Sequence, residues 1–183
     1  MEITETIYVK NRDEWRKWLE KNHDRKRCIW VVYQRKNSNK KYIIYDEALE
    51  EALCFGWIDS TVKTFDENRI VQRFTPRNPK SKFSQPNKER LKMLMAQGKI
   101  SDKEIKRAKK ILKEKFYFPK DILEKIMKNK KAWNNFNNFS ESYKRIRIAY
   151  INSARDDPEQ FRKRFNNFMK KTEKNTMFGF KGF

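Results

Sequence analysis

Strand-like runs of apolar residues occur only in the first 76 of this chain's 183 residues, and this limits the fold more than any other feature. In the first 76 residues apolar residues form short alternating or continuous runs with many β-branched side chains, which are typical of strands. From residue 119 onward they recur every three or four positions, which is typical of helices. This order predicts an α+β fold: a small antiparallel sheet with packed helices, followed by an α-helical C-terminal part. The strand-like runs are residues 3–9, 28–34, 57–65 and 68–76.

Helix and turn signals lie between these runs. Asn11, with Glu14 three residues later, is a capping pattern, so a helix is expected to follow Asn11. Asp46 is expected to open a second helix, and Gly56 to close it in a left-handed conformation. The segment "DEN" at residues 66–68 separates two strand-like runs and predicts an antiparallel hairpin.

The same signals divide the chain into three parts. Residues 1–118 are expected to form an α+β domain, residues 119–175 a helical module and residues 176–183 an aromatic tail. A polar turn is expected at residues 36–41. The N-terminal residues lack a signal-peptide pattern and no apolar run is long enough to span a bilayer, so we expect a cytoplasmic protein without a membrane span. The sequence gives no indication of the oligomeric state.

The composition is strongly basic, with 45 Lys and Arg residues against 24 Asp and Glu residues and a formal net charge of +21. Such a charge attracts polyanions. The C-terminal residues 101–183 hold 23 basic and 10 acidic residues. One hypothesis is therefore nonspecific, salt-dependent binding of nucleic acid, and the alternative is a basic composition that only solvates the surface. The arginines that would carry this binding are Arg145, Arg147, Arg155, Arg162 and Arg164.

Several catalytic and cofactor motifs do not occur in the sequence. There is no glycine-rich nucleotide loop and no GxSxG nucleophile motif. One histidine and two separated cysteines cannot supply four zinc ligands without carboxylates, so no metal and no cofactor are expected. Cysteine catalysis would need Cys54 beside His23, and the alternative is that Cys54 is a packed, unreactive thiol.

The segment "EALCFGWIDS", residues 51–60, contains no basic residue in a basic chain. Most of it predicts a structural joint: a helix end, a glycine and the start of a strand. Asp59 follows on that strand, and Arg73 lies on the strand that the hairpin pairs with it. Their similar distances from the turn predict a cross-strand contact between Asp59 and Arg73.

A polar site is expected around this contact. Trp57 would supply an apolar wall, and Arg77, whose direction is set by Pro76, would present its guanidinium to a ligand. Ser84 and Asn87 would complete a polar rim. Such a site would bind a small anionic or amide-bearing molecule. The shortage of acid–base residues favours a binding protein over an enzyme, and an enzyme that uses aspartate and arginine without a metal stays open as an alternative.

Three blocks of the sequence resemble a known family. "YDEALEEALCFGWIDS" (residues 45–60), "RFTPRNPKSKFSQPN" (73–87) and "MAQGKIS" (95–101) follow in the order seen in the YdeI/OmpD-associated family, also called bacteriocin-protection proteins. The family's basic helical module corresponds to "FSESYKRIRIAYINSARDDPEQFRKRF" (139–165). Phe83 stands where the family usually has tryptophan. The resemblance implies a role in cell-envelope stress or resistance to toxic peptides, and it implies no particular reaction, cofactor or catalytic residue.

Overall fold

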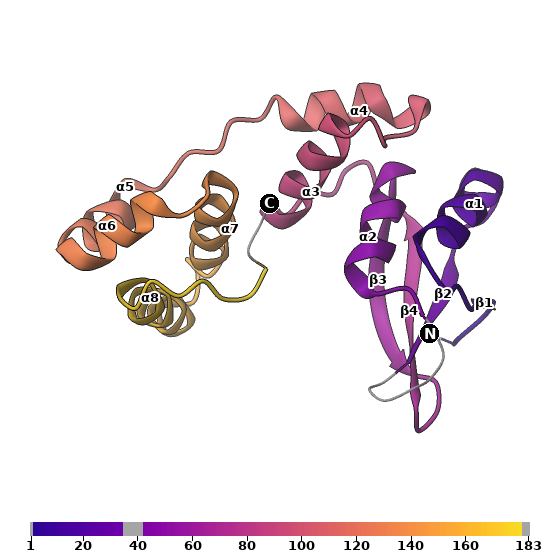
Figure 1. Cartoon of the computed structure of the whole chain (residues 1–183), viewed down its shortest axis with the longest axis horizontal. Helices are drawn as coiled ribbons and strands as arrows, with labels where there is room; N and C mark the ends of the chain where they lie inside the picture. Colours follow the sequence, from indigo (N-terminus) through magenta and orange to yellow (C-terminus); the bar gives the residue numbers. More distant parts are fainter. Residues whose placement is uncertain (1, 35–41, 181–183) are drawn as a thin grey trace. The chain divides into compact units, whose positions relative to one another are not determined.

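The structure, a computed structural model, describes residues 2–34 and 42–180. The turn predicted at residues 36–41 therefore lies outside the described residues. Within them the chain forms a four-stranded sheet and eight helices, labelled in chain order in Figure 1. Their bounds are β1 (Thr6–Ile7), α1 (Arg12–Asn22), β2 (Ile29–Gln34), α2 (Tyr45–Cys54), β3 (Trp57–Thr64), β4 (Arg69–Pro76), α3 (Gln85–Ala96), α4 (Asp102–Leu112), α5 (Lys120–Met127), α6 (Lys130–Asn138), α7 (Glu141–Asn152) and α8 (Pro158–Glu173).

Two compact units make up the chain, and each is assembled from two segments. The first unit contains the sheet with α1 and α2, and the second contains α5 to α8. The three-part division expected from the sequence, with boundaries at residues 118 and 175, stays a prediction. The first unit comprises residues 1–82 and 94–110, and the second comprises residues 83–93 and 111–183.

The sheet has the strand order β1-β2-β4-β3. β3 and β4 form the predicted hairpin, and β2 pairs antiparallel with β4. β1 runs parallel to β2 because α1 lies between them in the chain and returns it to the same end of the sheet. The predicted α+β fold with a helical C-terminal part is confirmed, and the parallel β1–β2 pair makes the sheet mixed and not wholly antiparallel.

Local signals set the two helices that precede the hairpin. The Asn11 side chain caps α1 by accepting a hydrogen bond from the Glu14 N–H at 3.0 Å, as the sequence predicts. α2 begins at Tyr45, one residue before the predicted start, and its N-cap residue makes no side-chain hydrogen bond. Gly56 follows α2 with φ +70°, also as predicted. This positive φ favours glycine, and a Cβ at Gly56 would also displace the Glu104 carboxyl carbon, which would lie 2.6 Å away.

Ion pairs join α1 to α2 through a buried carboxylate. The Glu51 side chain is 1% exposed and accepts from Arg12 at 3.0 Å and from Arg16 at 2.8 Å. Arg12 also donates to Glu50 at 2.8 Å. Burial lowers the pKa of Arg12, but its hydrogen bonds to Glu50 and Glu51 outweigh burial and the pKa is raised. Glu51, which lies in the segment "EALCFGWIDS", thus fastens one helix to the other.

Tryptophans pack between α1 and one face of the sheet. The ring centroids of Trp15 and Phe74 lie 5.5 Å apart, and those of Trp18 and Trp57 lie 5.8 Å apart. The Trp15 indole N–H donates to the Ala48 carbonyl at 2.9 Å, so its polar group is satisfied where it is buried. A separate cluster of buried side chains consists of Trp30, Val32 and Val71.

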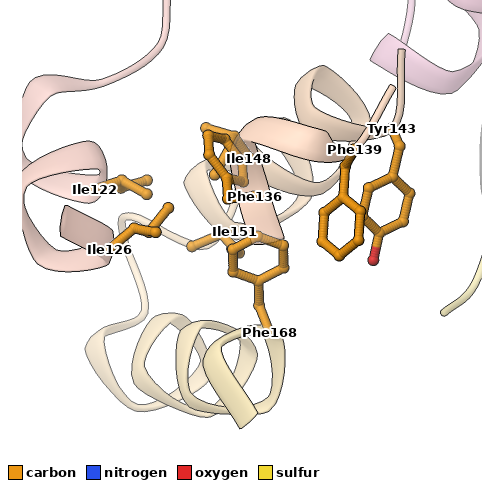
Figure 2. Close-up of a cluster of buried hydrophobic side chains, with 8 residues drawn as sticks. All are labelled: Ile122, Ile126, Phe136, Phe139, Tyr143, Ile148, Ile151 and Phe168. Atoms are coloured by element: carbon orange, nitrogen blue, oxygen red, sulfur yellow. The ribbon is translucent and has the colours of Figure 1, made fainter. Parts of the chain in front are cut away.

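The helices of the second unit enclose an aromatic and isoleucine core (Figure 2). Phe168 of α8 is buried in this core, and its ring centroid lies 6.1 Å from that of Phe136 on α6. The helical spacing of the last segment predicts this inward position. Phe161, Phe165 and Met169 are half-buried against the same core. The buried members are Ile122, Ile126, Phe136, Phe139, Tyr143, Ile148, Ile151 and Phe168.

Candidate functional site

The hairpin contains a β-bulge directly after Asp59. Asp59 pairs with Phe74 and Val62 pairs with Gln72, so Ser60 and Thr61 both stand opposite a single residue of β4, Arg73. The Gln72 side-chain amide donates to the Ser60 carbonyl at 3.2 Å, and the Ser60 hydroxyl donates to the Arg73 carbonyl at 3.3 Å. The bulge is therefore held by side chains from both strands.

The bulge makes the predicted contact between Asp59 and Arg73 wrong. Directly paired residues share a face of the sheet and neighbours along a strand point to opposite faces. Asp59 shares the face of its partner Phe74, whereas Arg73 shares the opposite face with its β2 partner Trp30. A hairpin without the extra residue would have put Asp59 and Arg73 on the same face.

Arg77 is held by hydrogen bonds to main-chain carbonyls. The Arg77 N–H donates to the Gly56 carbonyl at 2.9 Å, and its guanidinium donates to the carbonyls of Asn78, at 3.1 Å, and of Ser81. Burial, and then the charge of Arg107, lower the pKa of Arg77. These bonds close the loop after β4.

Trp57 is 1% exposed and its indole N–H donates to the His23 carbonyl at 3.1 Å, so it belongs to the core and does not form an open wall. Ser84 and Asn87 lie in the second unit, where Asn87 accepts from Arg90 at 3.5 Å. Their assignment to the rim of a site around Asp59 stays a prediction.

A different polar cluster surrounds Asp59. The Tyr45 hydroxyl donates to Oδ2 of Asp59 at 2.8 Å. Tyr33 on β2 pairs with Ile70 and so shares the face of Asp59. Tyr33 is 7% exposed, and its hydroxyl has no hydrogen-bond partner among the described residues. Burial, followed by the neighbouring Tyr45 and Asp59, raises the pKa of Tyr33 far above its usual value.

We call Tyr33, Tyr45 and Asp59 the Asp59 cluster. It reaches solvent at Tyr45, which is 43% exposed, and ends at the buried Tyr33 hydroxyl. The sequence does not single out either tyrosine. Tyr33 lies in a continuous apolar run, in which no alternation indicates a face, and Tyr45 precedes the predicted start of its helix. The position of Tyr33 in an apolar run is the one signal for a site, because a buried tyrosine hydroxyl needs a hydrogen-bond partner.

Cys54 and His23 do not have the surroundings of a catalytic pair. Cys54 is fully buried, and burial raises the pKa of its thiol to about 12. Nδ1 of His23 lies 2.8 Å from the Leu19 carbonyl, and Nε2 lies 3.1 Å from the Asp24 carboxylate. The thiol is therefore protonated near neutral pH, which fits the packed-thiol interpretation.

Two of the five arginines proposed for nucleic acid are neutralised by bidentate ion pairs. Arg145 donates to both carboxylate oxygens of Glu89, at 2.6 and 2.8 Å. Arg155 donates to both carboxylate oxygens of Asp121, each at 2.7 Å. Their guanidinium faces remain, but their hydrogen-bonding edges are occupied.

The other three arginines differ in burial. Arg162 is exposed on α8. Arg164 on the same helix donates to the Tyr150 carbonyl at 2.8 Å and to the Ser153 hydroxyl at 3.0 Å. Arg147 on α7 is 9% exposed. Arg162 is thus exposed and forms no ion pair with the described residues, and nucleic-acid binding stays a prediction.

The described part of the chain contains neither a metal-binding cluster nor a helix that could span a membrane. In residues 2–34 and 42–180, no three His, Cys, Asp or Glu side chains gather in a way that would hold a metal ion. No helix in the same ranges has the length and apolar character that crossing a membrane requires.

Two family models match successive parts of the chain. Residues 7–107, more than half of it, match a domain of unknown function, DUF8412. Residues 115–175 match the family described as bacteriocin-protection, YdeI or OmpD-associated, abbreviated OmdA. The resemblance seen in the sequence is confirmed, in the segment that holds α5 to α8, while "EALCFGWIDS" lies in the range of the first model. No curated protein and no solved structure matches the chain.

Proposed function

This chain belongs to the DUF8412 family and carries a bacteriocin-protection, YdeI or OmpD-associated domain, and from that premise we propose that it is a ligand-binding protein whose Asp59 cluster takes an amide-bearing molecule. The observation that carries the proposal is the buried Tyr33 hydroxyl without a hydrogen-bond partner, on the same face as the Tyr45–Asp59 pair. An unpaired buried hydroxyl costs the folded state about 1–3 kcal/mol. A ligand carbonyl that accepts from Tyr33 would recover that cost.

The chemistry of the cluster favours an amide over an anion. The Asp59 carboxylate accepts hydrogen bonds, and the tyrosine hydroxyls donate and accept them. An amide offers one N–H for the carboxylate and one carbonyl for a hydroxyl. An anion would be repelled by Asp59, and Arg73, which was expected to contact Asp59, shares the opposite face with Trp30.

A peptide is an amide-rich ligand. Every peptide unit carries the N–H and C=O pair that the Asp59 cluster matches. An extended peptide segment is therefore the ligand class that we propose for this site. Binding of this kind needs no metal, nucleophile or general base.

The test is a titration with two small probes, the neutral amide N-acetylalaninamide and the anion acetate, followed by NMR of the backbone N–H groups. The amide is expected to give saturable shifts at Tyr45 and Asp59, and acetate is not. Tyr33→Phe removes one hydroxyl and keeps the ring, so it should weaken amide binding about tenfold without lowering stability. Tyr117→Phe, at a ring that is 77% exposed, is the matched control.

Two results would refute the proposal. One is the absence of saturable amide shifts in the unmodified protein at any accessible concentration. The other is equal amide affinity in Tyr33→Phe and Tyr117→Phe, because the hydroxyl would then contribute nothing to binding.

A further inference from the structure

We infer that the second unit contains a binding site for a small phosphate-bearing molecule, formed by Arg147 of α7 and Arg164 of α8 beside the ring of Tyr150. This site is independent of the Asp59 cluster, which lies in the first unit. The two arginines come from different helices and share one aromatic neighbour: the guanidinium carbons lie 5.7 and 4.1 Å from the Tyr150 ring centroid.

Arg147 is a buried cation without a counter-charge. It is 9% exposed, its Nε has no hydrogen-bond partner, and no carboxylate forms an ion pair with it in the described part of the chain. Three more exposed arginines are neutralised by carboxylates: Arg12 and Arg16 bind Glu51, and Arg145 binds Glu89. Burying a charge without an ion pair is costly, so Arg147 is a candidate for a role other than stability.

Aromatic rings hold the Arg147 guanidinium in place. Its carbon lies 5.8 Å from the Tyr143 ring centroid and 5.3 Å from that of Phe178 in the C-terminal tail. Such rings attract a cation through their faces but offer no oxygen to its N–H groups. The rings therefore orient the guanidinium without satisfying its N–H groups, and an oxyanion would satisfy them.

The tail completes this arrangement. The Phe178 N–H donates to the Tyr143 hydroxyl at 3.3 Å. The next residue, Gly179, has φ +64°, and a Cβ there would lie 2.7 Å from one terminal nitrogen of Arg147. The main chain at Gly179 thus packs against the guanidinium. The positive φ explains why glycine stands at residue 179.

Arg164 supplies the second donor group. One terminal nitrogen is fixed by the Tyr150 carbonyl and the Ser153 hydroxyl, while its Nε has no hydrogen-bond partner. Tyr150 is 46% exposed, so the ring that both arginines adjoin reaches solvent. Two guanidinium groups beside an exposed ring match the oxygens of a phosphate group, and the ring can stack on an aromatic phosphate ester.

A purely structural role makes a different prediction. If Arg147 serves only to hold the tail through its rings, no anion should bind with saturation near it. The deciding measurement is the Nε–Hε NMR signal of each arginine during titration with sodium phosphate, with chloride used to keep ionic strength constant. We expect saturating shifts with one dissociation constant at Arg147 and Arg164.

Three variants distinguish phosphate binding at this site from nonspecific attraction of phosphate to a basic surface. Arg164→Gln should weaken phosphate binding about tenfold, and Arg147→Lys, which keeps the charge but loses the planar fork, should weaken it by a similar factor. Arg162→Gln is the matched control, because it removes the same charge from the same helix at an exposed position. It should leave the affinity within about twofold.

A comparison of three ligands shows which class of phosphate-bearing molecule the site binds. Phenyl phosphate should bind more tightly than inorganic phosphate if Tyr150 stacks on the ester, and Tyr150→Leu should remove that difference. Shifts that rise linearly at all arginines, or equal losses in Arg162→Gln and Arg164→Gln, would contradict the site. Saturation by a single-stranded oligonucleotide alone would also contradict it, and would indicate a nucleic-acid surface.

Discussion

The side-chain amide of Gln72 donates a hydrogen bond to the main-chain carbonyl of Ser60, 3.2 Å away on the neighbouring strand. This bond crosses the hairpin at the bulge, where Ser60 and Thr61 stand opposite Arg73. The extra residue moves the side chains of the preceding part of β3 to the opposite face of the sheet. Asp59 shares the face of Tyr33 as a result. The Asp59 cluster thus depends on a hydrogen bond made by a residue outside it.

Replacement of Gln72 by leucine should destabilise the first unit. Gln72 is 4% exposed. Leucine has a similar size, but it leaves the Ser60 carbonyl without the hydrogen bond that Gln72 donates. We expect the free energy of unfolding in urea to fall by about 1–2 kcal/mol. Gln97→Leu, at an exposed position, is the control and should change it by less than about 0.5 kcal/mol. Equal effects would mean that the bond does not hold the bulge.

Glu51→Gln should be one of the most damaging single changes in the first unit. It leaves Arg12 and Arg16 facing a neutral group where two charged hydrogen bonds existed. Loss of one member of a buried ion pair typically costs about 3–5 kcal/mol. Glu20→Gln is a close control, because Glu20 also pairs with Arg16, at 3.4 Å, but its side chain is 52% exposed.

The Glu20 change should cost less than about 1 kcal/mol. Thermal and urea unfolding of both variants would give the comparison. If Glu51→Gln lowers the free energy of unfolding no more than Glu20→Gln does, burial of the Glu51 carboxylate adds nothing to its ion pairs.

Glu89 should make the second unit less stable in acid. Burial raises its pKa, but the hydrogen bonds from Arg145 and Gln85 outweigh burial and the pKa is lowered. A carboxyl group with a lowered pKa in the folded state stabilises it above the unfolded pKa of about 4.3. That stabilisation is lost as pH falls through the lower, folded pKa.

The measurement is urea unfolding at pH values from neutral down to about 2.5, which spans that loss. The unmodified protein should lose stability over this acidic range, and Glu89→Gln should lose less over the same range because it has no carboxyl group to protonate there. Glu124→Gln, at an exposed position, should follow the unmodified protein. A Glu89→Gln curve parallel to that of the unmodified protein would contradict the assignment.

The two cysteines should react at very different rates in the native protein. Cys54 is buried with a pKa raised to about 12, whereas Cys28 is partly exposed. Iodoacetamide at mildly alkaline pH should therefore label Cys28 first, because the thiolate is the reactive form. Mass spectrometry of the intact protein should show one added group before unfolding and two after it in urea. Rapid native labelling of Cys54 would revive it as a candidate nucleophile.

The fold class follows from signals that act over a few residues. Asn11 caps its helix through the N–H of Glu14, three residues later, and Gly56 adopts the left-handed conformation that its position at a helix end predicts. The hairpin follows from two strand-like runs and the polar turn between them. Because each signal is local, the elements and their types can be predicted from the sequence.

The candidate sites depend on relationships between distant residues. The bulge at Ser60 has ordinary strand residues and is fixed by Gln72 on the other strand, so the sequence gives no sign that Asp59 changes face. Arg147 has the helical spacing of a surface arginine, and it is buried because Phe178, far along the chain, packs against it. Contacts of this kind are decided by tertiary packing and have no local pattern.

The order in which the two units can be completed follows from their interleaved segments. Residues 83–93 are synthesised before residues 94–110 but pack with the second unit, whose remaining part starts at residue 111. On the ribosome the first unit must therefore wait for its last segment, although a segment of the second unit has already emerged. No cut at a single peptide bond yields both units whole. Fragments that end near residue 110 carry an orphaned stretch that has lost its packing partners.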